Sequence, residues 1–544
     1  MVNRGKSVAM KKLNVLKILF FAILFLLTAA LIFVDIGWSE YSILQSRSID
    51  EYTFHRSLLN IHDGFTNLDI RQIFSFGFYS YGFTWFLMNY VFSFPFLGEA
   101  GNAYAIVIPR FLTSLFLVLS LLVVTKTING LKEKYDIGVI FALFFILSMP
   151  GIWMNAVWFH PDYAMSFFIL ISLYFISKAG IHFNKYYWIG IVMLGIAIAI
   201  KIQAVTFGAV ILFFYVKNYF EKMPIGLLVT NGVKTVFVIL MIFILNNAYI
   251  LHPSGFNAWY SSLQQNMLSN ATNHGSGTVS YFYRLNEAVF KNFFPLGTYF
   301  LVFALSIYYM FDNFSKKENI LLGYVGIYIA SNFIYLLIFV NKGWGHYYIP
   351  LVLLSPILIV AFVNQIIVKF NIRKKFKILP YIIIMIPNLY VFTSTNIEFF
   401  NLRINKSIIS YDLKKIKHSS EELGKAEAIE KIFQDESLKG KIILSSPYVN
   451  FPFKKLSVDY HNFYTIYGPL SSTLANSSLR NGADVDLVLI RKDDVYFDES
   501  LLSKLYEIDA YKTSKKIIDE WLDNGVGYVL KNENKNYYLF QKSI

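Results

Sequence analysis

The sequence has 544 residues, of which 56% are hydrophobic, 18% aromatic and only 15% charged. Soluble globular chains are about 45–50% apolar and about 25% charged, so this composition excludes an ordinary soluble protein. The chain contains no cysteine, which excludes disulfide frameworks, thiolate metal sites and cysteine nucleophiles. With a formal net charge of +14, the composition predicts a basic polytopic membrane protein.

The positive charge is concentrated in the hydrophobic part of the chain. Residues 401–544 carry 21 Lys and Arg against 20 Asp and Glu, which leaves 28 basic and 15 acidic residues in 1–400. These basic residues stand in short loops between apolar runs, as the positive-inside rule expects for cytoplasmic loops. We therefore predict contact with membrane lipids and no nucleic-acid partner.

Apolar runs of a length that can cross a hydrocarbon layer of roughly 30 Å recur along the first 400 residues. The first run follows a basic segment, so we expect the N-terminus in the cytoplasm. An odd number of spans then places the chain after the last one on the extracytoplasmic side. The eleven predicted spans are 15–34, 108–126, 137–157, 163–177, 187–200, 203–217, 227–250, 294–311, 319–340, 348–368 and 378–396.

Residues 76–97 are also hydrophobic enough to span, but a span there would turn every later basic loop outward. Their interspersed Gly, Ser and Pro suit an interfacial or re-entrant helix instead. We interpret residues 35–107 as the first extracytoplasmic loop, with juxtamembrane helices. The predicted domains are a membrane domain over 1–396 and an extracytoplasmic domain over 397–544, in a multi-pass protein of the cell membrane.

The last 148 residues have the pattern of a small soluble α/β domain. We predict helices over 412–435 and 517–525, strands over 441–446 and 484–490, and a hairpin over 528–542. Asp484 and Asp486 form a D-x-D, which can hold a metal–nucleotide in soluble glycosyltransferases. A polar lead into a buried strand is the favoured interpretation of so short a motif.

Candidate chemistry lies among the few acids of the membrane half, because carboxylates near apolar surface are costly unless paired or used. Asp50 and Glu51 stand in the first loop, where solvated loop charges are the alternative. Asp162 follows Pro161 in the segment WFHPDYA, where an ordinary first-turn helix acid is the alternative. Arg56 and His160 lie in the same two segments and are further candidates.

Basic and aromatic residues on the same predicted side complete the set. Lys201 interrupts an apolar run, either as a snorkelling side chain or as a fixed cation that holds an anionic group. The segment NKGWGHYYIP brings Lys342, His346 and Tyr347 just before a span, where aromatic belt residues are also expected. His274 lies in the long loop 251–293 and is either solvated or part of the site.

These segments, in this order, resemble a known family. The Asp-Glu pair in the first loop is followed by YSYGFTWFLMNYVFSFPF, PRFLTSLFLVLSLLVV, the acidic turn HPD, the turn ending at Lys201 and HYYIPLVLLSP. Over roughly residues 1–370 they resemble the polyprenyl-phosphate-sugar-dependent glycosyltransferases of the GT-C class. Protein O-mannosyltransferases and lipid A aminoarabinose transferases are the best-known relatives.

The resemblance implies a GT-C-like fold and transfer of a sugar from a polyprenyl-phosphate donor to a lipid, glycan or protein acceptor. Asp50 would be the general base in an inverting reaction, with Asp162 and Glu51 as further catalytic candidates. Lys201, His346 and Tyr347 would bind the donor phosphate. No cofactor is required by this scheme, and no His/Asp spacing indicates a divalent metal.

Two other functions share features with this scheme. A transporter or flippase of lipid-linked sugars would need ionisable groups near the bilayer midplane, whereas these acids gather at one face. A polysaccharide polymerase or ligase would use the same kind of donor, so the residues do not distinguish it from a transferase.

Overall fold

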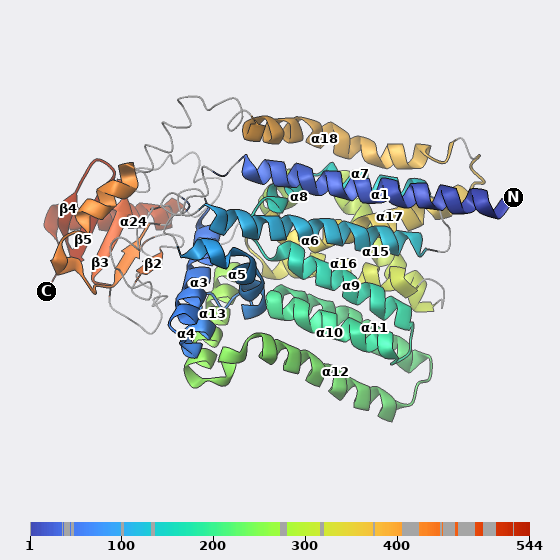
Figure 1. Cartoon of the computed structure of the whole chain (residues 1–544), viewed down its shortest axis with the longest axis horizontal. Coiled ribbons are helices and arrows are strands. Elements are labelled where there is room, and N and C mark those ends of the chain that lie inside the picture. The colour runs from blue at the N-terminus through green and yellow to red at the C-terminus, as the bar shows by residue number, and fades with distance from the viewer. Residues whose placement is uncertain are drawn as a thin grey trace.

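The structure is a computed structural model. It describes residues 2–34, 36, 44, 48–98, 103–131, 136–272, 280–315, 320–373, 376–404, 424–446, 449, 463–465, 470, 485–492, 508–525 and 527–543. Long apolar helices form a bundle, and a small mixed sheet lies beyond one of its ends (Figure 1).

The bundle helices coincide with the predicted spans. They are α1 (Val2–Phe33), α6 (Tyr104–Asn129), α7 (Asp136–Leu147), α8 (Pro150–Ala156), α9 (Asp162–Ala179), α10 (Lys185–Ile200), α11 (Gly208–Phe220), α12 (Ile225–Asn246), α15 (Leu296–Ser315), α16 (Ile320–Phe339), α17 (Ile349–Lys369) and α18 (Leu379–Ile404). Most are apolar all round, as expected for helices that face both lipid and neighbouring helices.

Length and composition identify seven helices of the described chain that could cross a membrane, or eight if α7 and α8 form one span bent by 70°. The bend stands at the predicted span 137–157, where Pro150 begins α8 and cannot donate a backbone hydrogen bond to the preceding turn. The count of eleven also needs the shorter apolar helices in α1, α10 and α15 to cross, and this remains a prediction.

A second group of helices gathers at the end of the bundle nearest the sheet. It consists of α3 (Ile49–Thr66), α4 (Ile70–Phe74), α5 (Phe83–Leu97) and α13 (Pro253–Thr272). Figure 1 shows α3 across the bundle end and α5 beside it, rather than along the length of the bundle. α5 has 15 residues, about 22 Å of helix, and it occupies most of the ambiguous segment 76–97.

The C-terminal region contains a five-stranded sheet of order β2-β1-β3-β5-β4. Its strands are β1 (Ile443–Ser445), β2 (Phe463–Thr465), β3 (Leu487–Arg491), β4 (Tyr528–Glu533) and β5 (Tyr537–Lys542). β1 pairs in parallel with β2 and β3, whereas β5 pairs antiparallel with β3 and β4. The predicted hairpin is confirmed, and β2 was not predicted.

The predicted helices of this region fall partly on the described chain. Residues 424–432 are helical, whereas 412–423 lie outside the described residues. α24 (Ile508–Asn524) begins before the predicted 517 and contributes Ile518 and Trp521 to the core of the sheet.

The D-x-D motif has a structural explanation at its second residue. Asp486 accepts a hydrogen bond from the backbone N–H of Ile442 at 2.8 Å, which holds the start of β3 beside β1. Asp484 lies outside the described residues. The favoured interpretation, a polar lead into a buried strand, agrees with this contact.

The orientation of the bundle in the membrane can be tested, because its two ends carry different parts of the chain. The start of α1 and the sheet lie at opposite ends in Figure 1. We predict that the sheet is extracytoplasmic, because the basic loops belong on the cytoplasmic side. A phosphatase that folds only outside the cytoplasm, fused after Ile544, should be active. An inactive phosphatase together with an active cytoplasmic reporter at the same position would contradict this orientation.

Candidate functional site

The predicted site residues other than Arg56 and His274 converge at the bundle end where α3 lies, and Tyr81, which was not predicted, lies with them. The predicted residues come from the start of α3, the turn between α8 and α9, the break after α10, and the segment before α17. We call this set the polar cluster. Its members are Asp50, Glu51, Tyr81, His160, Asp162, Lys201, Lys342, His346 and Tyr347.

Asp162 stands at the centre of the polar cluster and is 1% exposed. Lys201 donates from Nζ to its Oδ1 at 2.7 Å, and its Oδ2 contacts Nδ1 of His160. Asp162 is also the first residue of α9, where the helix dipole favours an acid. Asp162 is therefore a first-turn helix acid, as the alternative interpretation expects. Its side chain also forms a buried ion pair with Lys201.

Lys201 is directed inward by a break in the helix. α10 ends at Ile200, and Lys201 has extended backbone angles before a 3₁₀ turn begins. Its side chain is buried, with Nζ 4.8 Å from the ring centroid of Tyr347 and 5.5 Å from that of Tyr81. A snorkelling lysine would extend its ammonium to water, whereas Lys201 is a buried cation paired with Asp162. Its holding of an anionic ligand stays a prediction.

A glycine brings Tyr81 to the same place. Tyr81 forms an isolated β-bridge with Lys201, and Gly82 donates its N–H to Ile200 O at 3.0 Å. A Cβ on Gly82 would lie 1.6 Å from the carbonyl oxygen of Ala199, so a larger residue would push the two segments apart. The phenol of Tyr81 contacts Nε2 of His160 at 3.3 Å.

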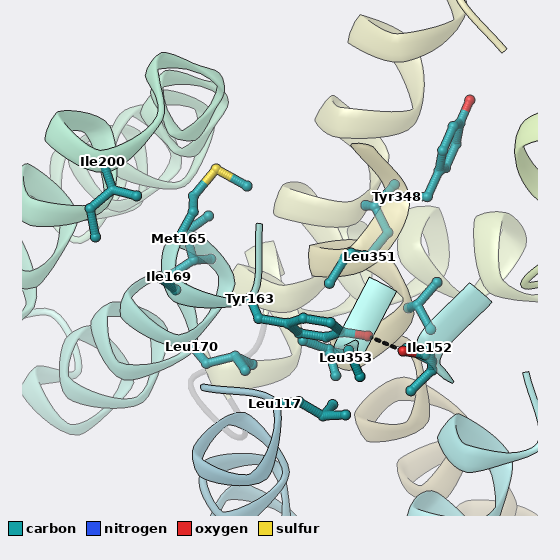
Figure 2. Close-up of a cluster of buried hydrophobic side chains, with 14 of the residues drawn as sticks. Leu117, Ile152, Tyr163, Met165, Ile169, Leu170, Ile200, Tyr348, Leu351 and Leu353 are labelled. Carbon is teal, nitrogen blue, oxygen red and sulfur yellow. Dashed lines mark hydrogen bonds between the residues drawn. The ribbon is translucent and has the colours of Figure 1, made fainter. Parts of the chain in front are cut away.

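The polar cluster rests on apolar packing. Figure 2 shows Tyr163, the neighbour of Asp162, directed among Leu117 and Leu353 toward Ile152. Its hydroxyl donates to Ile152 O at 2.8 Å, which joins the start of α9 to α8. Since close-packed side chains permit little movement, this contact holds Asp162 in place.

Glu51 is engaged by Arg110, which extends from α6. Arg110 donates from Nε to Oε1 at 2.7 Å and from its second terminal nitrogen to Oε2 at 2.6 Å. The backbone N–H of Phe159 adds a third bond to Oε1 at 2.8 Å. Both partners are 2% exposed, so this bidentate pair connects α3, α6 and the turn before α9.

Asp50 differs from its neighbour because it is only half-buried. Within the described chain its carboxylate forms neither a hydrogen bond nor an ion pair. Burial raises the pKa of Asp50, and the positive charges of His160, Lys201 and Lys342 partly offset that rise. A carboxylate that is held near cations yet keeps its oxygens unoccupied can accept a proton from a bound molecule.

Lys342 supplies a second buried cation. It is 5% exposed, and its Nζ lies 4.3 Å from the ring centroid of Trp344. Burial lowers the pKa of Lys342 to about 7, although the charge of Asp50 opposes the decrease. A small change in environment therefore decides whether this lysine is charged near neutral pH.

His346 and Tyr347 complete the wall of the polar cluster. The rings of His346 and His160 lie 4.6 Å apart, and the Trp158 ring stacks on His160 at 4.4 Å. His160, Asp162 and His346 offer ligand-type atoms within 4.8 Å of one another, so this group could hold a metal ion. The sequence spacing did not indicate such a group, because His346 is far from the other two residues in the chain.

Two of the predicted candidates, Arg56 and His274, are not placed in the polar cluster by any contact of the described residues. Arg56 is half-buried on α3, six residues beyond Asp50 and so about 240° away around the helix. His274 lies outside the described residues.

Two residues of the arrangement were missed by sequence analysis. Arg110 gave a usable signal, since an arginine within an apolar run of 26 residues needs a partner. Tyr81 is one of many aromatic residues in its segment and had no distinguishing signal.

No family model matches this chain, and no curated protein matches it. Among solved structures it is similar to the oligosaccharyltransferase of Archaeoglobus fulgidus tethered to an acceptor peptide containing the NVT sequon. The similarity covers 96% of this chain and 74% of that one, with 11% identity and a TM-score of 0.50.

A second similar structure is ArnT from Cupriavidus metallidurans bound to undecaprenyl phosphate. It covers 95% of this chain and 97% of that one, with 12% identity and a TM-score of 0.48. Both are membrane glycosyltransferases of the GT-C class. The similarity to the oligosaccharyltransferase shows that this multi-pass membrane chain has a GT-C-like fold, and an identity this low shows the fold alone.

Proposed function

We propose that this protein transfers a sugar from a polyprenyl-phosphate donor to an acceptor hydroxyl at the extracytoplasmic membrane surface, with inversion at the anomeric carbon. The observation that carries the proposal is that Asp50, whose carboxylate has no hydrogen bond or ion pair among the described residues, lies within the electrostatic influence of two buried lysines, Lys201 and Lys342. The GT-C-like fold supports the same chemistry, since the similar structures hold undecaprenyl phosphate or an acceptor peptide.

The proposed reaction has one displacement step. The acceptor oxygen attacks the anomeric carbon while its proton passes to Asp50. The bond from that carbon to the phosphate oxygen breaks, and its electron pair leaves with the polyprenyl phosphate. Lys201 and Lys342 stabilise the charge that develops on the phosphate, with His346 and Tyr347 beside it. The atoms and electrons of this step balance without a metal or another cofactor.

Glu51 and Asp162 take different roles in this proposal. Both oxygens of Glu51 are held by Arg110, so we assign it the positioning of α3 and hence of Asp50. Asp162 holds Lys201 at 2.7 Å and so fixes the cation beside the donor. Both side chains are buried, whereas that of Asp50 is half-buried.

The proposal is tested by measuring transfer directly. Glycolipids, polysaccharides and glycoproteins from cells with and without this protein are compared by mass spectrometry, which identifies the sugar and the acceptor. Purified protein in liposomes should then move that sugar from its polyprenyl phosphate to the acceptor. Movement of intact donor across the liposome membrane without transfer would instead establish the transporter.

Lys342 gives the proposed site a pH dependence. Its pKa is about 7, so it loses its positive charge as pH rises through that value. If the ammonium holds the donor phosphate, kcat/KM should fall above about pH 7, because this ratio reports the free enzyme. Arginine stays charged, so Lys342→Arg should retain kcat/KM up to about pH 9.

The matched control is Lys291→Arg, at an exposed lysine paired with Glu287, which should keep the wild-type profile. A Lys342→Arg profile that still falls near pH 7 would show that another group is responsible.

A further inference from the structure

We propose that His160, Asp162 and His346 form a binding site for one divalent transition-metal ion. Nδ1 of His160, Oδ2 of Asp162 and Nε2 of His346 are all buried. Nδ1 of His160 and Oδ2 of Asp162 contact each other and no other described group, and Nε2 of His346 has no hydrogen-bond partner within the described chain. Three converging ligand atoms of this kind, within 4.8 Å of one another, are unusual, because buried polar atoms are nearly always satisfied.

His160 and Asp162 each have a second polar atom, and that atom contacts a neighbouring side chain. Nε2 of His160 contacts the Tyr81 hydroxyl at 3.3 Å. The hydroxyl can accept from Nε2–H, and in that tautomer Nδ1 keeps the lone pair that a metal ion needs. Oδ1 of Asp162 accepts from Lys201 at 2.7 Å, which leaves Oδ2 for a single bond to a metal. Outer contacts of this type orient metal ligands and fix the tautomer of histidine.

A protonated His160 paired with Asp162 is the alternative explanation of these contacts. It accounts for Nδ1 and Oδ2, but it leaves Nε2 of His346 buried without a hydrogen-bond partner in the described chain. A metal ion uses all three atoms together.

The ligand set indicates which metal binds. Two imidazole nitrogens and one carboxylate suit Zn²⁺, whereas Mg²⁺ and Ca²⁺ prefer oxygen ligands. Three protein ligands leave a position open for an oxygen of a bound molecule. The positive charges of Lys201 and Lys342 weaken binding, and the negative charge of Asp50 in the same cluster strengthens it. Metal binding does not depend on the proposed sugar transfer.

The experiment uses the full-length protein in detergent, stripped of metal with a chelator and dialysed against Zn²⁺. One Zn²⁺ per chain is expected by elemental mass spectrometry, and Co²⁺ should give the visible absorption of a four-coordinate site. Mg²⁺ at the same concentration should not displace it. Absence of stoichiometric Zn²⁺ in the folded wild-type protein would overturn the proposal.

Variants separate a metal site from a structural ion pair. Tyr81→Phe should weaken Zn²⁺ binding by about 10–100-fold, and His346→Ala should weaken it more. His182→Ala, at an exposed histidine, is the control and should bind as wild type. Thermal unfolding of each stripped variant shows whether it is folded. If folded His346→Ala retains wild-type Zn²⁺ affinity, the proposed ligand set is wrong.

Discussion

Asp50→Asn is expected to lower turnover by about 10²-fold or more, the effect typical of removing a general base. Asparagine keeps the shape of the side chain but cannot accept the proton of the acceptor hydroxyl. Because Asp50 has no hydrogen bond or ion pair in the described chain, the substitution should leave folding and donor binding close to wild type. The measurement is single-turnover transfer from the polyprenyl-phosphate sugar, with donor binding measured separately.

Asp69→Asn provides the matched control. Asp69 caps α4 from an exposed position in the same predicted loop, through a bond from the N–H of Gln72, and asparagine is an equally good cap. This variant should transfer sugar at the wild-type rate. Turnover of Asp50→Asn within a few-fold of wild type would remove Asp50 as the base.

Arg110→Met is expected to destabilise the protein by about 3–5 kcal/mol, because it leaves the Glu51 charge buried without its partner. The guanidinium contributes two bonds of 2.6 and 2.7 Å to a carboxylate that is 2% exposed. Thermal unfolding of purified protein should show a midpoint well below that of wild type.

The double variant Glu51→Gln/Arg110→Met should recover part of the loss. It removes both charges, and the glutamine oxygen can still accept from the N–H of Phe159. Such non-additivity is the signature of a direct pair. Arg71→Met, at an exposed arginine of α4, should unfold near the wild-type midpoint. If Arg110→Met unfolds there as well, the pair does not hold α3 in place.

The sequence by itself determined that this is a membrane protein and where its helices lie. Runs of apolar residues have no other stable environment than lipid or a protein core, so each predicted span is helical, although the span 137–157 is broken into α7 and α8. The hairpin over 528–542 was equally predictable from the sequence, since two alternating apolar segments flank a short polar turn.

The tertiary structure decided how the polar residues combine. Asp50, Asp162 and Lys201 stand out in the sequence because charge near apolar surface is rare, but rarity does not reveal a partner. The pairing of Asp162 with Lys201 depends on the break after α10, and that of Glu51 with Arg110 on how α3 crosses the bundle end.

Contacts between residues far apart in the chain leave no local pattern in either segment. His346 meets His160 only after α9 and α17 pack together, and Tyr81 reaches His160 only because Gly82 permits close approach to Ala199. Local sequence specifies helices through hydrophobicity and turn chemistry, whereas the site arises from packing between helices, which becomes visible only in three dimensions.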